Sequence, residues 1–403
     1  MDSEWRTRDA CRRVAFWLVA LVFAATMVGT TLPTPLYVIY QARWHFPAAV
    51  VTVIFAAYAA GVLVTLLLAG RSSDQAGRKP MLAVALGASA LSTVVFIFAP
   101  GVPVLMVGRV LSGLSAGLVT GTATAALTDL VPASAGRRAS LVATGANMGG
   151  LGLGPLIAGL FAQYTPHPTT LVFEVYLAVL ATAGLSLWFV PETVGRRRRP
   201  VVGFTGLGLP ARGRGEFIAA GAGGFAAFAL LGLFSALAPA FLGTVLHQRS
   251  HLLQGAVVFL IFAVAAATQV GLSRFSGRPL VLGGLGLLLA ALGLIVTALA
   301  QAQMTLFLVG TVTGGLGVGA VMLAGLATAS RLAAPARRGQ AISAFFVACY
   351  AGLIIPVIGV GVLAGLIGTF PAVLAFSLLL AALCLFSLAR IATATALDKT
   401  VSR

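Results

Sequence analysis

The sequence predicts an all-helical integral membrane protein, with twelve transmembrane helices arranged as two pseudo-symmetric six-helix bundles. Three observations predict this fold class: an unusually apolar composition, apolar runs that recur along the whole chain, and motifs shared by the two halves. The 403 residues are 59% hydrophobic and only 9% charged. Soluble domains carry roughly 25% charged residues. The composition therefore excludes an ordinary soluble domain, because too few charges are available to cover a surface that faces water.

Twelve apolar runs are each long enough to cross a hydrocarbon core of ~30 Å as a helix. The predicted spans are 14–40, 48–70, 80–99, 104–128, 139–162, 170–190, 217–245, 252–272, 279–300, 304–329, 340–366 and 371–389. The long polar connection between the sixth and seventh spans divides the chain. We therefore expect an N-terminal six-helix bundle at 1–190, a cytoplasmic linker at 191–216 and a C-terminal six-helix bundle at 217–403.

The net charge of +17 is explained by membrane orientation rather than by nucleic-acid binding. With the N-terminus inside, 23 of the 26 lysines and arginines fall in inner segments. Only Arg43 and Arg249 fall in outer loops, and Arg109 lies within a span. Because cytoplasmic loops are enriched in Lys and Arg, we expect both termini to be cytoplasmic.

The sequence offers no pattern that is typical of catalysis or of a bound cofactor. Its three cysteines, Cys11, Cys349 and Cys384, are far apart and match no metal-ligand spacing or disulfide framework. We find no phosphate-binding loop and no pairing of a nucleophile with a base. We therefore expect neither enzymatic activity nor a cofactor.

The two halves repeat the same motifs in the same order. The segment DQAGRKPMLAVALG (74–87) matches RFSGRPLVLGG (274–284), and Pro155 in the fifth span corresponds to Pro356 in the eleventh. Duplicated six-helix halves around a site near the bilayer midplane are an architecture of transporters.

Arg109 is the cation that lies within a predicted span. A charge inside a span costs several kcal/mol and usually faces a cavity with a partner. Gly113, Gly117 and Gly121 continue its helix face at four-residue spacing, and such small residues let a neighbouring helix approach closely. We interpret Arg109 as a contact for an anionic substrate group or for a proton-carrying acid. The alternative is that its side chain extends to the outer surface.

Glu174 is an acid about one helical turn into the sixth span from the outer side. Burial raises the pKa of a carboxyl group and a nearby arginine lowers it. Glu174 and Arg109 are therefore candidates for a proton-coupling pair. The alternative is that Glu174 lies at the membrane interface, in contact with water on the outer side. Asn147 in the fifth span is a further candidate to line the substrate path.

The loop GRSSDQAGRK (70–79) concentrates charge between the second and third spans. Gly70 and Gly77 supply backbone freedom for the turn. Arg78 and Lys79 are accounted for as inner-face anchors. Asp74 is not, because acids contribute little to orientation, so we expect it to bind a helix N-terminus or a neighbouring arginine.

Three motifs resemble those of the major facilitator superfamily, and the resemblance covers essentially the whole chain. GRSSDQAGRKP (70–80) resembles the family's loop signature between spans 2 and 3, and LMVGRVLSGLSAG (105–117) resembles its pattern in span 4. GGLGLGPLIAG (149–159) resembles the span 5 signature of the drug and proton antiporter branch, which favours efflux. The PET at 191–193 is also common in the family.

The resemblance implies a secondary transporter that works as a monomer in the cell inner (plasma) membrane and exports a small amphipathic or anionic compound, coupled to protons. It also implies a gate on the cytoplasmic side that latches the two halves. The gating residues implied are Gly70, Asp74, Gly77, Arg78, Lys79, Asp129, Gly154 and Pro155.

Two departures from the family pattern keep alternatives open. Gln75 replaces a residue that is usually basic, and the first span has no acid, although many drug–proton antiporters carry one there. A facilitator or importer of a small solute such as a sugar or metabolite on the same fold is therefore the alternative function. A non-transporting membrane sensor is the remote one.

Overall fold

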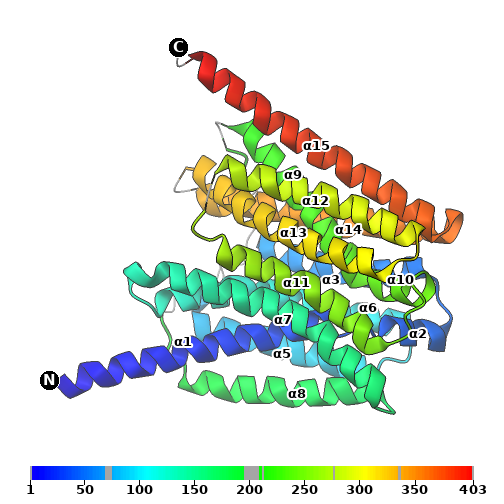
Figure 1. The fold of residues 1–403 in the computed structure, drawn as a ribbon. Helices are drawn as coiled ribbons and strands as arrows, with labels where there is room; N and C mark the ends of the chain where they lie inside the picture. The colour runs from blue at the N-terminus through cyan, green and yellow to red at the C-terminus, as the bar shows by residue number, and fades with distance from the viewer. Residues whose placement is uncertain are drawn as a thin grey trace. The chain divides into compact units, whose positions relative to one another are not determined.

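The computed structural model describes residues 2–68, 75–194, 208–210, 213–275, 277–334 and 337–401, and the regular elements in these ranges are helices (Figure 1). Twelve of the described helices are long and apolar enough to cross a membrane, which confirms the predicted all-helical membrane fold. The elements are α1 (Asp2–Thr31), α2 (Tyr37–Trp44), α3 (Ala48–Leu68), α5 (Arg78–Ile97), α6 (Val102–Asp129), η1 (Ala133–Ala135), α7 (Gly136–Tyr164), α8 (Pro168–Ser186), η2 (Leu187–Phe189), α9 (Arg214–Ala236), α10 (Ala238–Thr244), α11 (His251–Gly271), α12 (Arg278–Ala300), α13 (Met304–Leu332), α14 (Arg338–Ile367) and α15 (Thr369–Val401).

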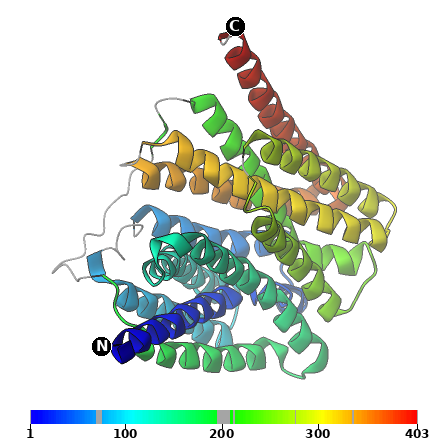
Figure 2. The same cartoon turned by 60° about the vertical axis from the view of Figure 1, so that its left-hand side comes forward.

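The chain divides into two compact units. The first comprises residues 1–39 and 57–205, and the second comprises residues 40–56 and 206–403. Within the first unit, α1 runs alongside α7, as Figures 1 and 2 both show. Within the second unit, α9 packs against α13, α14 and α15. The predicted boundaries of the two bundles and their linker remain predictions.

The first and seventh predicted spans are interrupted near their ends. Residues 14–40 were expected as one helix, but α1 ends at Thr31 and α2 begins at Tyr37. The turn between them contains Pro33 and Pro35, which lack a backbone N–H and disfavour the helical conformation in the residue before them. The span predicted at 217–245 likewise breaks at Leu237, and Pro239 lies in the first turn of α10.

The internal repeat predicted from the sequence is visible in the backbone of each half. Gly77 precedes α5 with a φ of 100°, and Gly277 precedes α12 with a φ of 90°. Glycine adopts such positive φ angles without the steric cost that a Cβ atom imposes. Pro155 lies inside α7 and Pro356 inside α14, so each half also carries the same helix-breaking residue.

Candidate functional site

Arg109 lies in the interior of the first unit. It is seven residues after the start of α6, or about 10 Å along the helix. Its side chain is completely buried, with 0% of its surface exposed. This burial agrees with an Arg109 side chain that faces the interior of the protein and does not extend to the outer surface.

The guanidinium of Arg109 is held by neutral groups. Nε donates a hydrogen bond to the hydroxyl of Tyr37, and Nη1 donates one to the carbonyl oxygen of Thr30. The rings of Tyr37, Tyr58 and Phe96 surround it, with their centroids 5.2, 5.8 and 5.9 Å from Cζ. Aromatic faces attract a cation through their ring quadrupole. Arg109 is therefore stabilised by three rings and two neutral acceptors.

The end of α1 supplies the carbonyl that Arg109 uses. In a continued helix, the amide of Thr34 would donate to the carbonyl of Thr30. Here it donates to the carbonyl of Thr31 instead, at 2.9 Å. The last carbonyls of a helix lack intrahelical donors. The helix end before Pro33 thus leaves the Thr30 carbonyl for the guanidinium, and the same break places Tyr37 beside it.

One nitrogen of the Arg109 guanidinium is left without an acceptor by the residues that the structure describes. Nη2 is buried and has no hydrogen-bond partner among the described residues, and no described carboxylate forms an ion pair with this arginine. A buried charge without a counter-charge is costly, and a buried N–H without an acceptor adds to that cost. The arrangement is chemically suited to an anion or a deprotonated acid, which would supply both missing interactions.

Two of the three glycines on the face of Arg109 bring α3 close to α6. A Cβ atom at Gly113 would lie 2.1 Å from the carbonyl oxygen of Tyr58, and one at Gly117 would lie 2.6 Å from Cβ of Thr65. A Cβ atom at Gly121 would meet nothing within 4 Å. The close approach therefore involves Gly113 and Gly117, and it positions the ring of Tyr58 against Arg109.

Glu174 lies on the exposed face of α8, and the structure does not bring it to Arg109. The buried face of α8 contains Val172, Phe173 and Tyr176, so position 174 projects away from the interior. The Tyr176 hydroxyl lies 3.0 Å from that of Ser89, inside the bundle. The aromatic residues Phe173 and Tyr176 lie on the buried face of α8. Their positions in the sequence could have indicated that Glu174 points outward.

The segment of α7 that contains Gly150, Gly154 and Pro155 packs directly on α1. Cβ atoms at Gly150 and Gly154 would lie 2.6 and 2.4 Å from the carbonyl oxygens of Ala24 and Val28. The hydroxyl of Thr31 donates to the carbonyl of Leu151 at 2.7 Å. Asn147, one turn before Gly150, is half-buried on the same helix.

A second cluster joins three segments of the first unit at one end of α5 and α6. Arg78 Nε donates to the carboxylate of Asp129 at 3.0 Å, and the hydroxyl of Thr193 donates to the same oxygen at 3.1 Å. Arg78 and Asp129, two of the gating residues that the resemblance implies, therefore form an ion pair. Gly70 and Asp74 lie outside the described residues.

Sequence reasoning missed Glu192, which binds the start of α5. Its carboxylate accepts hydrogen bonds from the backbone N–H groups of Arg78 at 2.8 Å and of Lys79 at 3.2 Å. A carboxylate is stabilising at a helix N-terminus, where backbone N–H groups lack partners. A Cβ atom at Gly77 would lie 2.5 Å from Glu192 Oε2, so the glycine is also needed for this approach.

A family model described as Major Facilitator Superfamily matches residues 18–356. The chain is 30% identical over 144 residues to the tetracycline resistance protein, class H, of Pasteurella multocida, covering 36% of this chain and 35% of that protein. It is 34% identical over 145 residues to a triacylglyceride transporter of Mycolicibacterium hassiacum, covering 35% of this chain and 27% of that protein. Each alignment thus spans about a third or less of the relative's length.

Solved structures resemble the chain over nearly its whole length. A bacterial homolog of the human lysosomal transporter Spinster superposes with a TM-score of 0.76 at 16% identity, covering 95% of this chain and 97% of that one. A human organic anion transporter superposes with a TM-score of 0.67 at 19% identity, covering 93% and 99%. At these identities the likeness shows the fold. Together with the family match over most of its length, it establishes that the chain belongs to the Major Facilitator Superfamily of membrane transporters.

Proposed function

We propose that the protein is a secondary active transporter that exports a small anionic or amphipathic compound by alternating access, coupled to protons. The observation that carries this proposal is the Arg109 guanidinium. It is fully buried, it is held only by neutral acceptors and rings, and its Nη2 has no partner among the described residues. A substrate carboxylate or phosphate at this position would gain a charge-assisted hydrogen bond.

Export is supported by the span 5 motif and by the names of two relatives, a tetracycline resistance protein and a multidrug transporter of Aspergillus fumigatus. The competing function is a facilitator or importer of a small solute such as a sugar. It is favoured by the first membrane helix, where the described residues 11–31 contain no acid. We place the protein in the plasma membrane as a monomer with cytoplasmic termini.

Glu174 is our candidate for proton coupling, with Asn147 as a residue of the substrate path. Because Glu174 is exposed on α8, it would take up a proton from the outer side without contacting Arg109 in this conformation. Glu174→Gln removes the titratable group and keeps the shape of the side chain. If Glu174 carries the proton, this variant loses the dependence of transport on a pH gradient. A variant that keeps this dependence overturns the assignment.

We propose a gate that opens and closes again during the transport cycle. It comprises Arg78, Asp129 and the segments around them. Arg78 pairs with Asp129, and Glu192 binds the start of α5, so this end of α5 is tied to two other segments. The remaining proposed gating residues are Gly70, Asp74, Gly77, Lys79, Gly154 and Pro155.

The test is uptake into inverted membrane vesicles energised by respiration, with a panel of fluorescent anions, amphipathic cations and neutral sugars. We expect an anionic or amphipathic compound to accumulate and an uncoupler to abolish this accumulation. Arg109→Ala should also abolish accumulation, although the variant still inserts into the membrane. Arg43→Ala, an exposed arginine of α2, is the matched control and should transport normally. Uptake that is insensitive to the uncoupler would favour the facilitator, and normal transport by Arg109→Ala would overturn the role of Arg109.

A further inference from the structure

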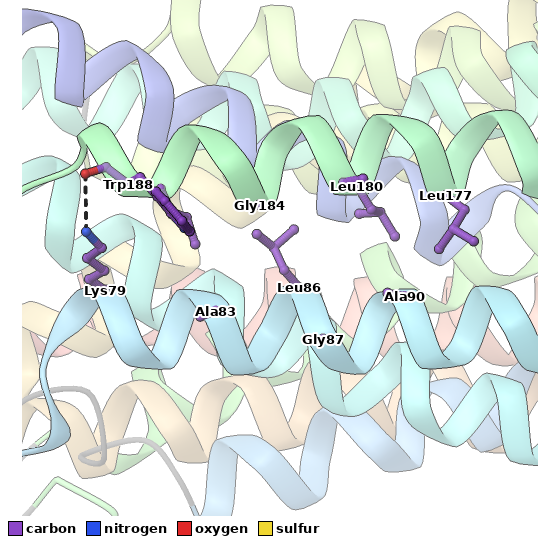
Figure 3. Close-up of a pocket in the computed structure, with 11 residues that line it drawn as sticks. Lys79, Ala83, Leu86, Gly87, Ala90, Leu177, Leu180, Gly184 and Trp188 are labelled. Carbon is purple, nitrogen blue, oxygen red and sulfur yellow. Dashed lines mark hydrogen bonds between the residues drawn. The ribbon is translucent and has the colours of Figure 1, made fainter.

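A groove of about 380 Å³ runs between α5 and α8 on the outside of the first unit (Figure 3). Its lining includes small residues on both helices, among them Ala83 and Gly87 on α5 and Gly184 on α8. Leu86 and Leu180 are buried and form part of the apolar lining. Both helices are membrane-spanning by length and composition, so acyl chains are the apolar molecules available to fill a groove that the two helices leave exposed.

The length of the groove matches one leaflet. Its lining on α5 runs from Lys79 to Ala90, which are separated by eleven residue steps, or about 16 Å at 1.5 Å per residue. The hydrocarbon core of a bilayer is about 30 Å thick, so one leaflet contributes about 15 Å. An acyl chain that enters beside Lys79 would therefore end near Ala90, where α5 faces Leu177 across the groove.

The groove has one polar end, and that end is cationic. Lys79 lines it, and Nζ donates to the carbonyl oxygen of Trp188 at 3.4 Å. An ammonium group has three N–H donors, so this single bond leaves two of them for another acceptor. Among the described residues, Lys79 forms no ion pair. Trp188, with 80% of its surface exposed, lies at the same end, where indole rings are enriched at membrane interfaces.

Glu192 is an acid at this helix start, and its charge is already engaged. Its carboxylate oxygens accept backbone N–H groups of Arg78, Lys79, Thr193 and Val194. The other cation at this helix start, Arg78, pairs with Asp129. Among the residues that the structure describes at the mouth of the groove, Lys79 is thus the charge that an ionic ligand can meet.

From these observations we propose that the groove binds one anionic phospholipid of the leaflet that contacts Lys79. The phosphate would accept hydrogen bonds from the ammonium group of Lys79, and one acyl chain would lie along the channel between α5 and α8. The positive-inside pattern identifies this leaflet as the cytoplasmic one, where anionic lipids attract basic side chains. The proposal depends on the membrane fold alone and holds for any transported substrate.

Trp188 provides a direct reporter of the occupant. Trp5, Trp17 and Trp44 are replaced by phenylalanine, so that Trp188 is the sole tryptophan of the full-length chain. The protein is reconstituted into phosphatidylcholine bilayers in which a fraction of either phosphatidylglycerol or phosphatidylcholine carries brominated acyl chains, which quench tryptophan fluorescence on contact. We expect phosphatidylglycerol to bind about fivefold more strongly than phosphatidylcholine, as one basic side chain near the surface implies. Lys79→Gln should abolish the preference, and Lys79→Arg should retain it.

A second pair of variants tests the channel. A Cβ atom at Gly87 meets nothing within 4 Å, so Gly87→Leu should fill the groove without moving the backbone and should reduce quenching by both lipids. Gly286→Leu is the matched control, because Gly286 is an exposed glycine of α12 with the same open space, and it should leave quenching unchanged. Equal quenching by both lipids in the unmodified chain, with no effect of Lys79→Gln, would overturn the anionic site. Weak quenching that Gly87→Leu does not change would show that no lipid chain occupies the groove, and would overturn the proposal.

Discussion

The hydroxyl of Thr31 on α1 donates a hydrogen bond to the carbonyl oxygen of Leu151 on α7, at 2.7 Å. Leu151 is four residues before Pro155, whose nitrogen has no hydrogen to donate to that carbonyl. A side chain of α1 therefore satisfies the acceptor that the proline of α7 leaves open. In a bilayer core, where water is absent, such re-satisfaction is what allows proline within a spanning helix.

Thr31→Val should destabilise the protein by about 0.6 kcal/mol and by no more than about 1.7 kcal/mol, the mean and the maximum measured for hydrogen bonds between membrane helices. The lost bond leaves the Leu151 carbonyl without its interhelical donor, and valine has nearly the same volume. Thr31→Ser restores the donor and should recover most of the stability. Thermal unfolding in detergent measures the change.

Thr26→Val is the control for this comparison, because the Thr26 hydroxyl donates to the carbonyl of Val22 in its own helix. It should cost less than Thr31→Val. Equal losses for the two variants would show that the contact with Leu151 has no particular role.

Gly113→Ala should weaken the packing of α3 on α6, whereas Gly121→Ala should be neutral. The added Cβ would lie 2.1 Å from the carbonyl oxygen of Tyr58 in the first variant and would meet nothing within 4 Å in the second. Overpacking of this kind typically costs about 1–3 kcal/mol. The melting temperatures of the two variants in the same detergent give the comparison, and similar temperatures would contradict the close approach.

Tyr37→Phe should impair transport more than it impairs folding. The variant keeps the ring against Arg109 and removes the hydroxyl that accepts from Nε, so a second donor of the buried guanidinium loses its partner. We expect a changed dependence of transport on substrate concentration, with the melting temperature close to that of the unmodified protein. Tyr164→Phe, at an exposed tyrosine that ends α7, is the control. Transport unchanged in Tyr37→Phe would argue that Arg109 is held by Thr30 and the rings alone.

Glu192→Gln should loosen the start of α5. The carboxylate accepts backbone N–H groups with both oxygens, and the amide that replaces it keeps only one acceptor oxygen. Hydrogen exchange at the amides of Arg78 and Lys79 should accelerate, and exchange at Arg278 in α12 should not. Unchanged exchange in α5 would show that Glu192 does not stabilise this helix start.

Several features of the fold follow from local sequence. The twelve spans can be predicted from the sequence because the thickness of the hydrocarbon core sets the length of each apolar run. The internal repeat can be predicted from the sequence because its two halves share glycines and prolines, whose backbone conformations few other residues adopt. The matched pairs are Gly77 with Gly277 and Pro155 with Pro356. The break after Thr31 was missed, although Pro33 and Pro35 signal it, because hydropathy continues across the turn.

The partners of Arg109 could not be predicted in the same way. Tyr37 and Thr30 are 72 and 79 residues away in sequence. Glu174 was a candidate partner of Arg109 because it lies about one turn into its span, but depth in the membrane does not determine which way a helix is turned. In α8 the buried positions 172, 173 and 176 turn Glu174 outward.

The sequence by itself determined that this chain is a twelve-helix membrane protein with duplicated halves, and that Arg109 lies within a span. Only the tertiary structure decided that Arg109 meets Tyr37 and Thr30, that Glu192 binds the start of α5, and that α5 and α8 leave a groove between them. The physical reason is that apolarity is a property of each segment, whereas rotation and contact depend on packing. In a helix that is apolar on all sides, hydropathy alone does not show which face meets its neighbour.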